Sequence, residues 1–181
     1  FHTVSGYSNP DESTHDPFHL GHASTSLSLT AGLMIGRDLQ HKTQPIVTMI
    51  GDGALSGGEA YEALNHLATM SSQCLIIIND NEQSIAENHG GLYSHLQQLR
   101  DTHGESPNNL FKALGFSYRY VDDGNSLESL IHALKNCKDE TTPTVLHIHT
   151  TKGHGYDKAI ANPEGFHNPS GFDIDTGETK K

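Results

Sequence analysis

Two short apolar runs, residues 46–50 (IVTMI) and 74–79 (CLIIIN), flank a stretch with helical patterning from about 56 to 69. Short runs rich in β-branched residues are typical of strands that a parallel sheet buries on both faces. Ser56 and Glu59 have the spacing of a capping box at the start of the helix between them. A strand, a helix and a strand within about 30 residues form a βαβ unit with a right-handed crossover. The chain is therefore predicted to contain a parallel sheet.

The same alternation continues along the chain. Helices are expected over 24–39, 109–115 and 126–137, and strands over 116–121 and 144–151. Alternating strands and helices predict an α/β fold, with helices on both faces of a parallel sheet. The polar stretch 82–107 is expected to be an irregular, mobile loop that contains a short helix near 92–100.

The length of 181 residues suits one domain, which we expect to occupy residues 1–161. Residues 162–181 are rich in Gly, Pro and Asp, as in a linker that leaves a domain. The sequence begins with Phe1 instead of methionine, which favours a fragment or a trimmed chain.

Composition excludes several classes of function. The formal net charge of −11, with eleven scattered Lys and Arg, argues against nucleic-acid binding. No run approaches the roughly 20 apolar residues that span a bilayer. The N-terminus is neither basic nor apolar, unlike a signal peptide. Cys74 and Cys137 lack CxxC spacing, which favours unreactive thiols in a reducing cytoplasm.

Polar residues follow each of the first two expected strands. Asp52 stands in a GDG sequence after the first, and Asn79, Asp80 and Asn81 end the second. Ligands of open α/β sheets bind beyond the carboxyl ends of the strands, so these oxygens converge if the two strands are neighbours. Carboxylate and amide oxygens suit Mg²⁺ or Ca²⁺ better than zinc.

The stretch GDGALSGGEA contains no Lys or Arg, although its glycines would let a phosphate approach. A divalent cation that bridges the aspartate and a diphosphate supplies the missing positive charge. Taken singly, GDG and NDN are more simply explained as tight turns. Together, at the ends of adjacent strands, they favour a metal site. A nucleotide site is less consistent, because the P-loop and GxGxxG patterns are absent.

The spacing of GDG and NDN resembles the thiamine-diphosphate motif of the transketolase-like enzymes. The flanking blocks are similar, in order, to those of the 1-deoxy-D-xylulose-5-phosphate synthases: HDPFHLGHASTS, IGDGALSGGEAYEALN, IINDNEQSIAENHGGL, HTTKGHGY and FHNPSGFDIDTGE. This resemblance covers nearly the whole chain. It implies a thiamine-diphosphate-binding fold, with thiamine diphosphate and Mg²⁺ as cofactors.

The resemblance also implies roles for individual residues. Asp52 and Asn81 match the two side-chain Mg²⁺ ligands, and the main-chain carbonyl of Gln83 completes the set. Gly53 and Ala54 match the turn against the cofactor's diphosphate, which Asn81 also approaches through the metal.

Other matching residues lie further from this turn. Gly21, His22 and Ala23 match a segment that touches the cofactor, with Ala23 in place of the usual serine. His22 is the expected catalytic proton-transfer or hydrogen-bond partner near the thiazolium ring. Tyr156 and, with weaker support, Lys152 and His167 match further cofactor or phosphate contacts.

The reaction that the resemblance implies joins pyruvate and D-glyceraldehyde 3-phosphate to form 1-deoxy-D-xylulose 5-phosphate, a precursor of isoprenoids and thiamine. The family is expected to act as a homodimer in the cytoplasm. Its activating glutamate belongs to a pyrimidine-binding second domain, which would follow the linker and is absent here. An upstream histidine block of the family is also missing, so domain 1–161 is expected to be incomplete at its N-terminal side. The isolated chain should therefore bind the cofactor weakly and turn over little.

Two alternatives remain. The chain could be one subunit of a split transketolase or 2-oxoacid dehydrogenase, or a non-catalytic thiamine-diphosphate-binding module. The departures from the family pattern are a short stretch between NDN and the third strand, DDGN at 122–125, and His154 in place of a basic residue. His147 and His149 share a strand face, but a structural role is favoured because no third metal ligand is apparent.

Overall fold

The computed structural model describes residues 5–179, and its centre is a four-stranded, fully parallel sheet. The strands are β1 (Val47–Gly51), β2 (Leu75–Asp80), β3 (Ser117–Val121) and β4 (Thr144–His149), in the order β1-β2-β4-β3. Gly51 of β1 pairs with Asn79 of β2, and Asp80 of β2 pairs with His149 of β4. The carboxyl ends of these three strands therefore lie side by side.

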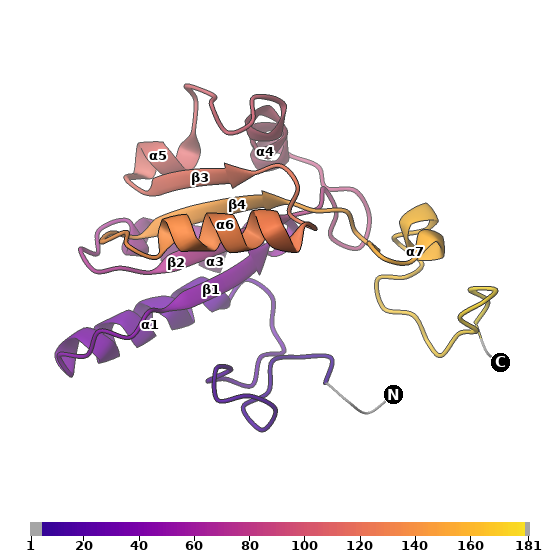
Figure 1. Ribbon diagram of the computed structural model, residues 1–181, viewed down its shortest axis with the longest axis horizontal. Coiled ribbons are helices and arrows are strands. Elements are labelled where there is room, and N and C mark those ends of the chain that lie inside the picture. The colour runs from indigo at the N-terminus through magenta and orange to yellow at the C-terminus, as the bar shows by residue number, and fades with distance from the viewer. Residues whose placement is uncertain (1–4, 180–181) are drawn as a thin grey trace.

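Helices cover both faces of the sheet, as predicted (Figure 1). A larger apolar core joins one face to α1, α3, α4 and α5, and a smaller core joins the opposite face to α6. The helix bounds are α1 (Ser26–Leu39), α2 (Asp52–Leu55), α3 (Gly58–Leu67), α4 (Gly91–Asp101), α5 (Leu110–Leu114), α6 (Leu127–Cys137) and α7 (Asp157–Ala161). The α/β fold class is confirmed.

The capping-box prediction at Ser56 is wrong. The chain forms the short helix α2 directly after β1, so α3 begins only at Gly58, with Gly57 as its N-cap and no side-chain cap. The Ser56 hydroxyl instead donates to the Gly53 carbonyl, at 2.9 Å. The predicted start of α1 at Ser24 is also too early. Ser24 has a left-handed φ of 71°, and the helix begins at Ser26.

The stretch 82–107 is more regular than expected. Its helix α4 spans eleven residues and buries Leu96 and Leu99 completely in the larger core. The two leucines lie about one helical turn apart, on the same face of α4. Their burial explains why this stretch is helical although most of its other residues are polar.

The segment after β4 contains α7, which the sequence did not reveal. Tyr156 stacks on Phe172 and meets Phe166 edge-on, and its hydroxyl donates to the Ile174 carbonyl at 2.8 Å. Figure 1 shows this segment leaving the carboxyl end of the sheet. Its role as a linker stays a prediction, and residues 180–181 lie outside the described part. Within residues 5–179, no helix has the length and apolar character that crossing a membrane requires.

Candidate metal and diphosphate site

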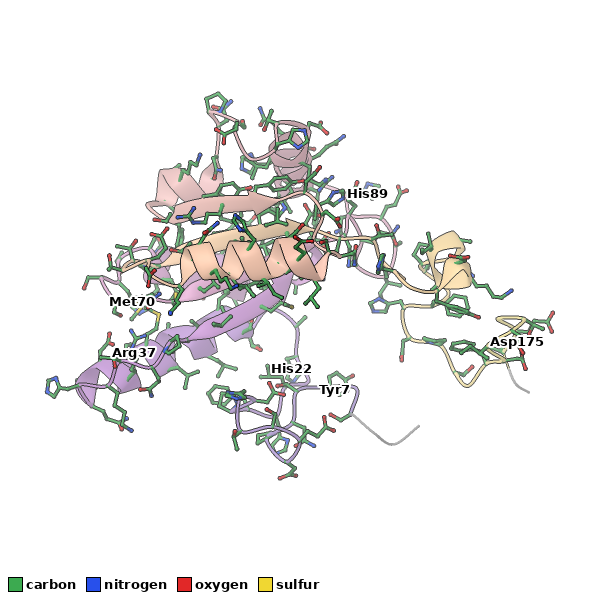
Figure 2. The ribbon with its side chains drawn as sticks, viewed as in Figure 1. Tyr7, His22, Arg37, Met70, His89 and Asp175 are labelled. Carbon is green, nitrogen blue, oxygen red and sulfur yellow. The ribbon has the colours of Figure 1, made fainter. Side chains whose placement is uncertain are left out.

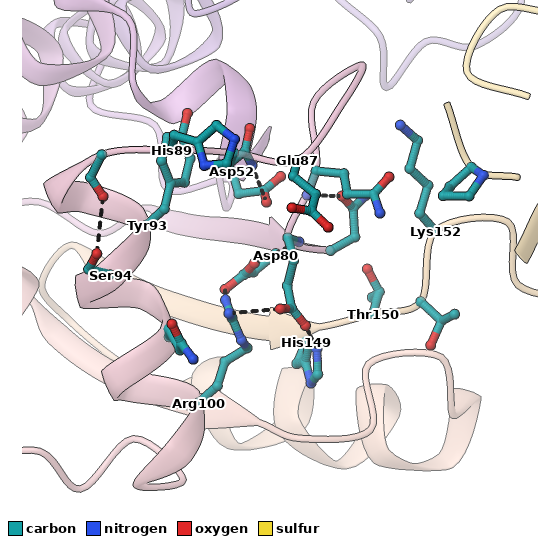
Figure 3. A pocket seen from close by; sticks show the side chains of 18 of the residues that line it. Asp52, Asp80, Glu87, His89, Tyr93, Ser94, Arg100, His149, Thr150 and Lys152 are labelled. Carbon is teal, nitrogen blue, oxygen red and sulfur yellow. Dashed lines mark hydrogen bonds and ion pairs between the residues drawn. The ribbon is translucent and has the colours of Figure 1, made fainter. Parts of the chain in front are cut away.

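A polar cavity of about 700 Å³ opens at the carboxyl ends of β1, β2 and β4 (Figure 3). Its walls come from Asp52, the turn after β2 (80–83), residues 87–90, α4 and residues 149–152. This is the place where the parallel topology predicts a ligand. The adjacency of β1 and β2, on which that prediction depended, is confirmed.

Asp52 is a buried carboxylate with 1% of its surface exposed. Its Oδ1 accepts the Gly53 N–H at 2.9 Å, and its Oδ2 accepts from Asn88 Nδ2 at 2.9 Å. Within the described part of the chain, no Lys, Arg or His forms an ion pair with it. Burial and the nearby charge of Asp80 raise the pKa of Asp52 to about 6.

Asn81 and Gln83 lie in a tight turn that follows β2. The Gln83 N–H donates to Asn81 Oδ1 at 3.2 Å, and Glu82 between them has a left-handed φ of 68°. Both residues line the cavity that Asp52 lines. The structure thus brings the three predicted metal ligands to one cavity, while their coordination of a metal stays a prediction.

The chemistry of this donor set fits a hard divalent cation. A buried carboxylate without a cationic partner is costly, and a metal ion is one way to offset that cost. The predicted ligands are a carboxylate, an amide oxygen and a backbone carbonyl, which suit Mg²⁺. Residues 5–179 hold no group of three His, Cys, Asp or Glu side chains placed for a metal.

Gly53 lies where two segments approach closely. A Cβ at Gly53 would lie 2.6 Å from Ser84 Cβ, so only glycine fits against this loop. Ala54 accepts a hydrogen bond from Ser24 Oγ at 2.7 Å through its carbonyl. A Cβ at Gly57 would lie 2.2 Å from the same Oγ. The GDGA turn is thereby joined to the segment before α1.

Three predicted cofactor residues, Gly21, His22 and Ala23, are exposed in that segment and do not line the cavity. Figure 2 shows His22 there, apart from His89 at the strand ends. The bond from Ser24 to Ala54 is the link that the structure provides between this segment and the GDGA turn. The roles of Gly21, His22 and Ala23 stay predictions.

Of the remaining candidates, Lys152 lines the cavity, and its Nζ donates to the carbonyls of Ser84 at 2.5 Å and Ile85 at 3.2 Å. Tyr156 faces the aromatic residues of the tail instead of the cavity. His167 lines a separate pocket, beside Ile85. The structure therefore groups Lys152 with Asp52 and Asn81, and does not group Tyr156 or His167 with them.

The sequence is similar to a known family of proteins over most of its length. The family described as 1-deoxy-D-xylulose-5-phosphate synthase matches residues 1–106 and 101–150. Proteins of that name from Pelotomaculum thermopropionicum, Carboxydothermus hydrogenoformans and Chlorobium luteolum are 35%, 36% and 37% identical to the chain. The matches cover 100%, 98% and 98% of this chain, and 34% of each relative. The chain belongs to the 1-deoxy-D-xylulose-5-phosphate synthase family.

The chain spans about a third of the length of these synthases. The alignment with the Pelotomaculum synthase runs over 216 residues, more than the 181 of this chain, so that synthase has residues that this chain lacks. The two matched segments of the family meet at 101–106, directly after α4. The short stretch expected between NDN and the third strand stays a prediction.

Sequence reasoning missed a buried polar network behind the turn at residues 81–83. Arg100 Nη1 donates to Asp80 Oδ2 at 2.5 Å, and His147 Nε2 donates to the same oxygen at 2.9 Å. The Tyr118 hydroxyl lies 2.8 Å from His147 Nδ1. Burial alone would raise the pKa of Asp80, but His147 and Arg100 outweigh it and hold the pKa below its usual value.

His147 and His149 do not share a ligand in this network. His149 pairs with Glu82 at 3.1 Å, whereas His147 is fully buried against Asp80. The structural role favoured for His147 is consistent with these contacts. Alternation along the strand does not separate the two histidines, because both share the face of the buried Val145; His147 is buried because it lies inside β4, and His149 is its last residue.

Proposed function

We propose that this chain is the Mg²⁺- and thiamine-diphosphate-binding part of a 1-deoxy-D-xylulose-5-phosphate synthase. The complete enzyme would be a transketolase-type transferase that condenses pyruvate and D-glyceraldehyde 3-phosphate to 1-deoxy-D-xylulose 5-phosphate. One observation carries the proposal. Asp52, buried and without a cationic partner among the described residues, shares a cavity with Asn81 and Gln83. Membership of the family supports the proposed cofactor and reaction.

We assign the residues of the site different parts in binding the cation and the cofactor. Asp52, Asn81 and the Gln83 carbonyl would hold the cation, which would supply positive charge for the diphosphate in a stretch without Lys or Arg. Gly53 lets the loop at Ser84 close against the turn. When bound, thiamine diphosphate supplies the electron sink for decarboxylation and carbon–carbon bond formation.

Two further residues act around this core. Lys152 holds the loop at Ser84 and Ile85 beside the cavity through its two hydrogen bonds. His22 would hold or move a proton near the reacting ring, since imidazole titrates close to neutral pH. Its exposed segment is joined to the GDGA turn through Ser24.

We also propose the wider organisation that the resemblance implies. Residues 1–161 form the diphosphate-binding domain, and 162–181 lead toward a pyrimidine-binding domain that carries the activating glutamate. The complete enzyme would be a cytoplasmic homodimer. The chain alone should therefore bind the cofactor weakly and show little or no turnover.

Calorimetry tests the binding half of this proposal. Thiamine diphosphate is titrated into the chain with Mg²⁺, and again with EDTA in its place. Binding that requires Mg²⁺ and disappears in Asp52→Ala supports the proposal. The matched control is Asp139→Ala, an exposed aspartate outside the cavity, which should bind as the unaltered chain does. No binding, even when the second domain is supplied, would favour a module that has lost the cofactor.

The reaction is tested separately, with the second domain supplied. Pyruvate with D-glyceraldehyde 3-phosphate is compared with a ketose phosphate donor. Product from the first pair alone supports the synthase. Product from the ketose donor would favour a split transketolase.

A further inference from the structure

Asp80 joins four parts of the fold around the cavity. It ends β2, and its carboxylate contacts Arg100 of α4, His147 of β4 and the N–H of Glu82 in the following turn. Its carbonyl accepts the N–H of Thr150 at 2.8 Å. The side chain is completely buried. Asp80 therefore connects the predicted metal-site turn to α4 and β4.

The oxygens of Asp80 are already used within the protein. Oδ2 accepts from Arg100 and His147, and Oδ1 accepts the Glu82 N–H at 3.1 Å. Asp52 differs, because it accepts from one backbone N–H and one neutral amide. The two carboxylates are thus arranged for different tasks. Asp52 has no cationic partner among the described residues and is available to a cation, whereas Asp80 is ion-paired with Arg100.

The turn that Asp80 holds is strained. Glu82 has φ 68°, a conformation that residues with a Cβ rarely adopt, so neighbouring contacts must maintain it. Asp80 accepts its N–H, while Arg100 Nη2 at 3.1 Å and His149 Nε2 at 3.1 Å bind its carboxylate. Arg100 binds the carboxylates of Asp80 and Glu82 at once. The backbone N–H of Glu82 is held by Asp80 and its side chain by Arg100, so both ends of the strained residue are fixed.

From this geometry we infer that Asp80, Arg100 and His147 form a positioning network for the predicted metal site. The network holds Glu82 in its left-handed conformation and so presents Asn81 and Gln83 to the cavity before any cation arrives. None of its three members ligates the metal. The inference rests on the proposed function, since it concerns how the same site is formed.

The physical reason is preorganisation. Without the network, Glu82 would return to a common backbone conformation, and the cation would have to impose the strained one at the expense of affinity. Residues that orient metal ligands typically change metal affinity 10–100-fold when altered. His147 is itself oriented by Tyr118, so the network extends to β3.

The test is an NMR-monitored titration of the unaltered chain with Mg²⁺ in the presence of thiamine diphosphate, which measures weak dissociation constants. Arg100→Met should weaken Mg²⁺ binding at least tenfold. Adding Glu82→Gly to Arg100→Met should recover part of that loss, because glycine adopts φ 68° without strain. A role in overall stability predicts no such recovery.

Arg37→Met is the matched control. Arg37 is also buried and hydrogen-bonded, but it lies at the opposite end of the sheet from His89 (Figure 2). The Arg37→Met variant should unfold at a lower urea concentration than the unaltered chain, and its Mg²⁺ affinity should stay within twofold of that of the unaltered chain. If Arg100→Met does not fold, Arg100→Lys is used instead. Lysine keeps the positive charge but cannot bind Asp80 and Glu82 with two separate nitrogens, so Arg100→Lys should also weaken Mg²⁺ binding.

The outcomes separate the inference from the function. Unchanged Mg²⁺ affinity in the Arg100 variants, or an equal loss in Arg37→Met, overturns the positioning role while the proposed function stands. Weaker binding without recovery by Glu82→Gly also overturns it. No Mg²⁺-dependent binding by the unaltered chain overturns the proposed function, and the inference with it.

Discussion

Asp52→Asn should stabilise the metal-free chain, although Asp52 is central to the proposed site. Burial and Asp80 raise the pKa of Asp52 to about 6, from the usual value of 3.8. At pH 7.5 this difference corresponds to a penalty of about 3 kcal/mol for keeping the charged form folded. Asparagine removes the charge and retains an oxygen for the Gly53 N–H. Asn88 can turn its amide to accept from the new NH₂ group.

The assay is urea denaturation with EDTA at two pH values. Because the folded pKa lies above the unfolded one, Asp52 stabilises the fold only when protonated, and this contribution is lost as the pH rises through about 6. We therefore expect the variant to be more stable than the unaltered chain by about 3 kcal/mol at pH 7.5. The gain should fall by about half at pH 5, where the unaltered carboxyl is largely protonated in the folded state.

The same variant should abolish Mg²⁺-dependent cofactor binding, which links the stability gain to the loss of function. Asp139→Asn, an exposed aspartate, should change neither quantity. A variant that is less stable than the unaltered chain at pH 7.5, or a gain that does not depend on pH, would refute the reasoning that Asp52 bears an uncompensated charge.

Three other changes test the surroundings of the site. Gly57→Ala should cost about 1–3 kcal/mol in urea denaturation, because the added carbon would overlap Ser24; a second change, Ser24→Gly, should restore stability, and a failure to do so would discount this contact. Gly53→Ala should remove the calorimetric signal of cofactor binding by displacing the loop at Ser84, and full binding would argue that the loop does not need to approach. Lys152→Met should speed amide exchange at 84–86 about tenfold or more without moving the urea midpoint; unaltered exchange would mean that its hydrogen bonds do not hold the loop.

The sequence predicted the strands of the sheet whose residues form a continuous apolar run. The apolar runs at 46–50 and 74–79 became β1 and β2 within one residue, because buried β-branched strands have few alternatives. Asp52 and Asn81 were predicted to converge because parallel strands end at the same edge of a sheet.

The sequence was less informative where a residue can form either a local contact or a contact with a distant part of the chain. Ser56 suits a helix cap, but α2 forms first and directs its hydroxyl to Gly53. Arg100 lies in a polar stretch, and nothing local shows that it reaches Asp80, twenty residues earlier in the chain. The contact depends on how α4 packs through Leu96 and Leu99, which is a tertiary property.

The central claim is that Asp52 and Asn81 share one hard cation that binds a diphosphate. Anomalous diffraction from crystals grown with thiamine diphosphate, and with Mn²⁺ in place of Mg²⁺, tests it most directly. We predict one anomalous peak at coordination distance, roughly 2.0–2.3 Å, from oxygens of Asp52 and Asn81 and from the diphosphate. A cofactor bound without a metal at these residues, or a metal bound elsewhere in the chain, would contradict the claim.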